Sequence, residues 1–148
     1  MSDDPRLTLF AAHRGAQEKY DYFLLTAAGA SVAFAVNQTQ GAKLSWFQVP
    51  LAAAVLAWGL SFFWGCIRLR YVDAAMSANL EILRITSGQH PDVPPHPQMI
   101  AAAAAGARSG AEHNSSRGQM YARLQFYSLI FGAILFVAWH VLEMAMQK

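Results

Sequence analysis

The chain has 148 residues, of which 55% are hydrophobic and only 14% are charged. Soluble globular domains carry about 25% charged residues, so this composition argues against an ordinary soluble domain. The formal net charge of +2 is too small to indicate a nucleic-acid partner, and a single cysteine excludes an internal disulfide.

The N-terminal part of the chain predicts a polar segment followed by a short apolar run. Residues 1–21 mix acidic and basic side chains, unlike a secretory signal, and we expect them to form a cytoplasmic N-terminal segment. Residues 22–39 are uncharged, but their apolar part, 22–36, gives about 22 Å of helix, short of the roughly 30 Å hydrocarbon core. We expect a first span across a thinned bilayer, with an interfacial helix as the alternative. A short outer loop, 40–44, would follow.

The second uncharged run has 24 positions, from 44 to 67, and predicts a span over 45–67. Beyond it, apolar residues such as Leu69, Val72 and Met76 recur every three or four positions. This spacing predicts an amphipathic helix over 68–87 that extends the second span into the cytoplasm and stops at Gly88. The series also fits a short heptad seam. It therefore indicates either a coiled coil between protomers or a helix lying on the bilayer or on its own chain.

The region before the last span is rich in helix breakers and small residues. Four prolines fall between positions 89 and 99, followed by alanine, glycine and serine. Since this stretch has little apolar surface to bury, we expect a flexible, proline-rich cytoplasmic connector over 88–120. The 19 uncharged residues from 124 to 142 then predict a third span over 121–146.

The distribution of lysine and arginine orients the spans. With three spans, residues 1–21 and 68–123 hold nine of these cations on one side, and the opposite side holds two. The positive-inside rule places the N-terminus in the cytoplasm and the C-terminus outside. The predicted fold is an all-α, multi-pass integral membrane protein of the plasma (cytoplasmic) membrane, with three transmembrane helices.

One polar pair lies at the end of the third predicted span. His140 and Glu143 are three residues apart and share a helix face, so they form a possible intramembrane polar pair. Because Glu143 follows 19 uncharged residues, contact with the outer headgroups is the simpler interpretation. A pair offers too few ligands for a zinc site. His90 and His96 beside the prolines are the other metal-ligand candidates, and we expect neither a metal nor a cofactor.

Small residues recur at four-residue steps in each predicted span. Such faces let helix backbones approach closely in lipid. The candidate helix-packing residues are Ala27, Ser31 and Ala35 in the first span, Ala57, Ser61 and Gly65 in the second, and Ser128 and Gly132 in the third. The pattern leaves open whether these faces serve folding or assembly.

The sequence contains no phosphate-binding loop, zinc-protease motif or nucleophile elbow, so nothing points to an enzyme. The leading hypothesis is a non-enzymatic membrane protein that acts through helix association, as an accessory subunit or a homo-oligomer. Its partners would be the lipid bilayer and a second copy or another membrane subunit. The alternative is an oligomeric channel or membrane-perturbing effector gated by its cytoplasmic segment, although no span carries a polar stripe. A metal- or proton-handling transporter is the third hypothesis.

Overall fold

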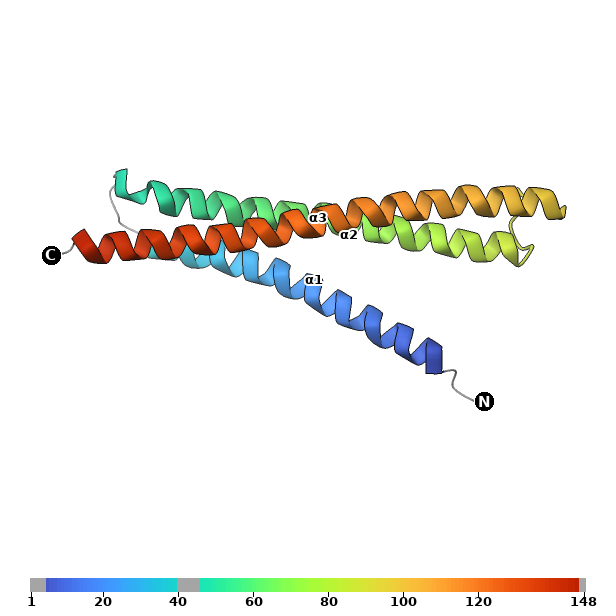
Figure 1. Ribbon diagram of the computed structural model, residues 1–148, viewed down its shortest axis with the longest axis horizontal. Coiled ribbons are helices and arrows are strands. Elements are labelled where there is room, and N and C mark those ends of the chain that lie inside the picture. The colour runs from blue at the N-terminus through green and yellow to red at the C-terminus, as the bar shows by residue number, and fades with distance from the viewer. Residues whose placement is uncertain (1–4, 40–45, 147–148) are drawn as a thin grey trace. The chain divides into compact units, whose positions relative to one another are not determined.

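The computed structural model of the protein describes residues 5–39 and 46–146, and this part of the chain is entirely helical apart from its connections. Its elements are α1 (Pro5–Gln38), the short 3-10 helix η1 (Trp46–Gln48), α2 (Val49–Thr86) and α3 (Pro97–Met146) (Figure 1). Contacts divide the chain into two units. The three-helix unit takes in the described residues up to Gly65 and from Leu124 onward, and the hairpin unit is Cys66–Arg123.

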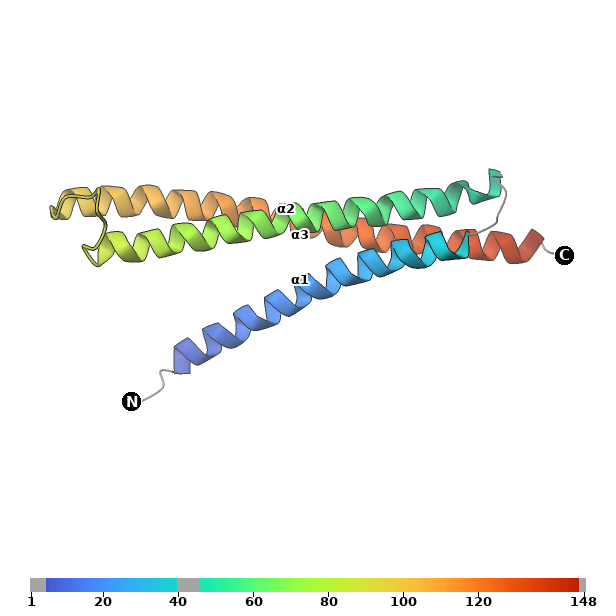
Figure 2. The ribbon, with the colours of Figure 1, turned by 180° about the vertical axis from the view of Figure 1, so that it is seen from behind.

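The three-helix unit has a small core to which all three helices contribute. Its buried members are Ala35 of α1, Leu51, Ala54 and Trp58 of α2, and Trp139 of α3. The Phe136 ring packs against those of Phe34, at a centroid distance of 5.8 Å, and Trp58, at 5.7 Å. The C-terminal half of α1 therefore lies beside both other helices, as both ribbon views show (Figures 1 and 2).

Two helical stretches, Trp46–Thr86 and Pro97–Met146, are long and apolar enough to cross a membrane. Only 33% and 11% of their most apolar windows are buried. The core helix of a soluble protein would have its apolar face covered. In the three-helix unit, by contrast, most large apolar side chains lie on the outer surface. They include Leu56, Leu60 and Phe63 on α2, and Tyr127, Phe131, Ile134 and Val137 on α3.

The prediction of an all-helical chain is confirmed for the described residues. The third predicted span and residues 46–67 of the second lie within these two stretches, and residue 45 falls outside the described residues. The first predicted span, 22–39, lies almost wholly in α1, which already begins at Pro5 and continues without a break past residue 21. Among the described residues, α1 is not one of the helices that are long and apolar enough to cross a membrane. The predicted outer loop, 40–44, falls outside the described residues.

The hairpin unit consists of the second part of α2 and the first part of α3, which run antiparallel and are joined by residues 87–96 (Figures 1 and 2). The rings of Tyr71 and Tyr121 stack at 5.4 Å between centroids, with 18° between their planes. The small Gly118 faces Tyr71 and Val72. The amphipathic part of α2 thus packs on its own chain, which was one of the two arrangements open from its spacing.

The end of α2 confirms Gly88 as the stop signal. Gly88 has a φ of +69°, in the left-handed region that suits glycine. Its N–H donates to Ile85 O (3.1 Å), and the N–H of Gln89 donates to Arg84 O (3.0 Å). These two bonds form a Schellman motif, which satisfies carbonyl groups left open at the helix end.

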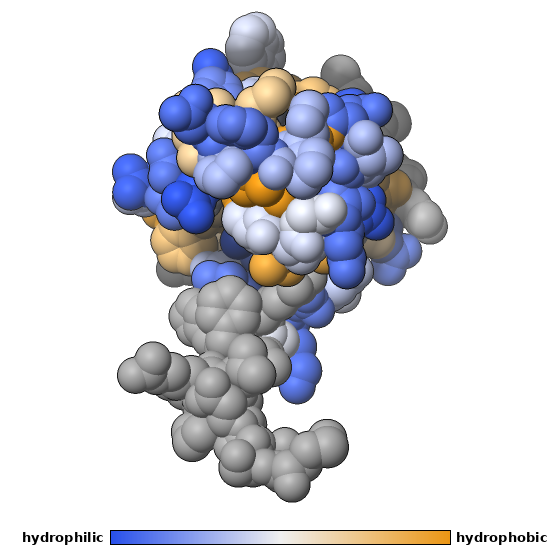
Figure 3. Space-filling model, turned by 90° about the vertical axis from the view of Figure 1, so that its right-hand side faces the viewer, coloured by the Kyte–Doolittle hydropathy of each residue, from blue (hydrophilic) through white to orange (hydrophobic). Residues whose placement is uncertain are grey.

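The flexible connector expected over 88–120 needs correction, because residues 97–120 belong to α3. Pro97 stands at the first helical position, where its missing N–H removes no helix bond, and five alanines at 101–105 favour continued helix. The connection shortens to 87–96. Within it, His90 pairs through Nε2 with the Glu81 carboxylate, while its Nδ1 accepts the Asp92 N–H at 3.1 Å. Hydrophilic residues dominate the surface seen from this end (Figure 3).

Candidate functional site

All three helices of the three-helix unit converge at Gly65. A methyl group added at Gly65 would lie 2.6 Å from Leu25 Cδ2 of α1 and 2.7 Å from Gln125 Nε2 of α3. Side chains of the other two helices therefore occupy the space that a side chain at position 65 would need. This is the close backbone approach that small residues permit between membrane helices.

Polar groups are buried at the same place. The Ser61 hydroxyl is fully buried and donates to the Gln125 carbonyl oxygen at 2.8 Å. The Gln125 side chain is 1% exposed, and neither its Oε1 nor its Nε2 has a hydrogen-bond partner within the described chain. Asp21 of α1, one helical turn before Leu25, is also buried, at 7% exposed, and is engaged with another group.

A second close approach lies farther along the same helix pair. A methyl group at Gly132 would lie 2.6 Å from two ring atoms of Trp58 and 3.1 Å from the carbonyl oxygen of Ala54. The Trp58 Nε1–H donates to Leu129 O at 3.2 Å. Two side chains of α2 thus donate to carbonyl groups of α3, and both bonds sit beside a glycine. We call the buried contact between α2 and α3 that is formed by Trp58, Ser61, Gly65, Gln125 and Gly132 the polar seam.

The structure places most of the predicted helix-packing residues inside this unit. Ala35, Ala57, Ser61, Gly65 and Gly132 are buried, whereas Ala27, Ser31 and Ser128 are half-buried. Ser128 also borders a shallow, open hollow on α3, together with Tyr127, Ile130, Phe131 and Ile134. The small residues Ala57, Ser61 and Gly65 of α2 and Gly132 of α3 are therefore already buried within the same chain.

His140 and Glu143 are both exposed on α3, and no hydrogen bond joins them in the described part of the chain. The His140 ring instead lies 6.2 Å from that of Trp139. His90 pairs with Glu81, while His96 is exposed at the turn before α3. Among the described residues, no three histidine, cysteine, aspartate or glutamate side chains gather as a metal site would require.

Sequence reasoning missed Gln125, although a signal for it exists. Gln125 is the only amide in the uncharged run 124–142. It precedes Gly132 by seven residues, or about two helical turns, so the two share a helix face. An amide on the small-residue face of a predicted span marks an interhelical contact. Asp21 carried no such signal, because it borders the charged N-terminal segment.

Comparison with protein-family models, curated proteins and solved structures finds no match to this chain.

Proposed function

We propose that the chain is a multi-pass integral protein of the cytoplasmic membrane, with three spans, a cytoplasmic N-terminus and an external C-terminus. It acts without catalysis, through helix association, as an accessory subunit of a membrane assembly or as a homo-oligomer. In this proposal the three-helix unit lies in the bilayer. The hairpin unit, Cys66–Arg123, projects into the cytoplasm.

One observation carries the proposal: the three-helix unit buries small and polar residues beside a small apolar core, while most of its large apolar side chains lie on its outer surface. Its largest fully buried side chains are Gln125 and Ser61, while Phe63, Phe131 and Ile134 are 53%, 57% and 60% exposed. In water this arrangement would leave a large apolar surface uncovered. In a bilayer, lipid covers that surface, and small residues give the helices close contact.

Packing supports a third span in α1. Leu24, Ala28 and Ala35 of α1 are buried in the three-helix unit, whereas Tyr22 and Phe23 are exposed, as large apolar side chains are on the other two helices. Because α1 packs along the two proposed spans and exposes aromatic rings as they do, we infer that lipid surrounds all three helices. With α1 as a span, the cation counts of nine against two give the proposed orientation.

Association with a further subunit would use the outer surface, because five of the eight predicted helix-packing residues are buried within the chain itself. The polar side chains Ser61 and Gln125 also point into the chain's own interior. Within the described residues they therefore supply no outward stripe to line a water-filled pore between copies. This supports association over conduction.

The test is the native mass of the protein extracted from membranes in a mild detergent. We expect a defined complex heavier than one chain, made of identical chains or of this chain with another subunit. A monomer under every mild extraction condition would contradict the association.

A Gly132→Leu variant separates folding from assembly. Because Gly132 already meets Trp58 of the same chain, we expect the variant to lower thermal stability. A variant that lost the complex at unchanged stability would instead place this glycine between chains.

A further inference from the structure

Three arginines stand near the tyrosine pair of the hairpin unit, toward the end away from its connection. Tyr71 stacks on Tyr121, and in an antiparallel pair the residues before Tyr71 lie level with those after Tyr121. Arg70 and Arg123 therefore lie toward the end away from the connection, and Arg117 lies one turn to the other side of the tyrosines. Arg70, Arg117 and Arg123 are exposed, and no ion pair joins them to the described residues. We call these three residues and the tyrosine pair the arginine collar.

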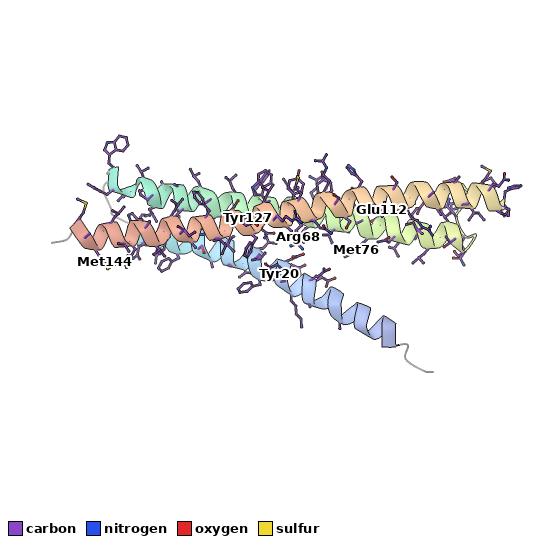
Figure 4. All side chains as sticks on the ribbon, in the orientation of Figure 1. Tyr20, Arg68, Met76, Glu112, Tyr127 and Met144 are labelled. Atoms are coloured by element: carbon purple, nitrogen blue, oxygen red, sulfur yellow. The ribbon has the colours of Figure 1, made fainter. Side chains whose placement is uncertain are left out.

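The balance of charge around the collar is strongly positive. Between Cys66 and Asp73 and between Asn114 and Arg123 there are four arginines and one carboxylate, that of Asp73. Arg68, labelled in Figure 4, is half-buried and already engaged with another group, so the collar consists of the three exposed arginines and the tyrosine pair. The other arginines of this unit, Arg84 and Arg108, lie farther along toward the connection.

The collar also marks the limit of both apolar runs. Arg68 is the first charged residue after the uncharged run of α2, and Arg123 is the last one before that of α3. Tyrosine and arginine side chains at such a boundary lie at the depth of the lipid headgroups. A guanidinium group there can bind phosphate oxygens with two parallel N–H bonds.

We propose that the arginine collar binds the phosphate groups of anionic phospholipids in the cytoplasmic leaflet. This inference rests on the proposed membrane function and adds its lipid partner. The tyrosine pair sets the spacing between the two helices, and the exposed guanidinium groups contact headgroups around the hairpin. Preference for anionic over zwitterionic lipid follows from the net positive charge of the collar.

The test is native mass spectrometry of the purified full chain, titrated with phosphatidylglycerol or with phosphatidylcholine. We expect the wild-type chain to retain phosphatidylglycerol preferentially. The double variant Arg70→Gln/Arg123→Gln should bind it about tenfold more weakly, since each arginine near a membrane surface strengthens binding severalfold. The matched control Arg84→Gln/Arg108→Gln removes the same charge far from the collar and should bind as the wild type does.

Equal losses in both double variants would show a general charge effect and overturn the collar site, as would unchanged binding in the collar variant. Binding of inorganic phosphate that is lost in the collar variant would show a soluble-phosphate site and overturn the lipid assignment.

Washing membranes at alkaline pH separates this inference from the function it rests on. A chain that stays in the membrane without lipid preference contradicts only the collar, whereas a chain that washes off contradicts the membrane function itself.

Discussion

At the scale of single residues, the two seam glycines are not equivalent. At Gly65 the nearest atoms are the tips of the Leu25 and Gln125 side chains, which can rotate away. At Gly132 they are the Trp58 ring and the Ala54 carbonyl oxygen, which are fixed by packing and by the helix. A well-packed interior resists added volume most where its neighbours cannot move.

We therefore expect Gly132→Ala to destabilise the chain by about 1–3 kcal/mol, and Gly65→Ala to destabilise it less. The measurement is thermal unfolding in detergent, followed by circular dichroism. Gly59→Ala is the control, because a methyl group there meets nothing within 4 Å and alanine favours helix by roughly 0.5–1 kcal/mol. Equal stabilities of the Gly132 and Gly59 variants would show that the close approach at Trp58 is not needed.

The second prediction at this scale concerns the buried Gln125 amide. Since neither end of the amide is hydrogen-bonded in the described chain, Gln125→Met should leave stability unchanged or raise it by about 1 kcal/mol. Ser61→Ala removes a real bond to Gln125 O and should lower stability by roughly 0.6 kcal/mol. Unfolding of the two variants in the same detergent compares them. A greater loss in Gln125→Met than in Ser61→Ala would show that the amide makes a bond that the fold requires.

Residue spacing alone identifies five of the buried small residues, but it does not show whether they pack within one chain or between chains. Four-residue steps place Ala57, Ser61 and Gly65 on one face of α2 whatever that face meets. Only the contacts at Gly65 and Gly132 show that the partner is the same chain. Burial of Asp21 could not be predicted, because it depends on where α2 and α3 meet α1.

At the scale of elements, the connection between α2 and α3 depends on its glycine. Alanine at position 88 would have to adopt the φ of +69°, which costs a residue with a side chain roughly 1–2 kcal/mol. We expect Gly88→Ala to fray the end of α2 and to speed limited proteolysis within 87–96. Gly106→Ala is the control, because that glycine lies inside α3 with nothing near it. Equal rates of proteolysis in the two variants would contradict the role given to the Schellman motif.

The elements also show where sequence reasoning fails. The end of α2 was predictable, since a glycine after an amphipathic run supplies its own local signal. The start of α3 was not, because prolines suggested a long connector and 97–120 has little apolar surface. Helix propensity of the alanines and packing of Gly118 against Tyr71 favour helix there instead.

At the scale of the whole molecule, the proposed function depends on the surroundings of the three-helix unit. Under the proposed function, lipid covers its many outward apolar side chains, and its buried small residues allow close contact between the helices. The hairpin unit differs in composition, since it carries six of the chain's eleven lysines and arginines. This contrast underlies both the proposed orientation and the arginine collar.

The most direct test is cysteine labelling in intact cells that produce the protein. In a Cys66→Ser background, single cysteines replace Ala12, Ser109 or Met146, all of which have exposed side chains, and a membrane-impermeant maleimide is added outside. We predict labelling of Met146→Cys alone, with the other two reacting only after the membrane is opened. External labelling at residue 109 would contradict the orientation, and external labelling at residue 12 alongside a protected residue 109 would remove α1 as a span.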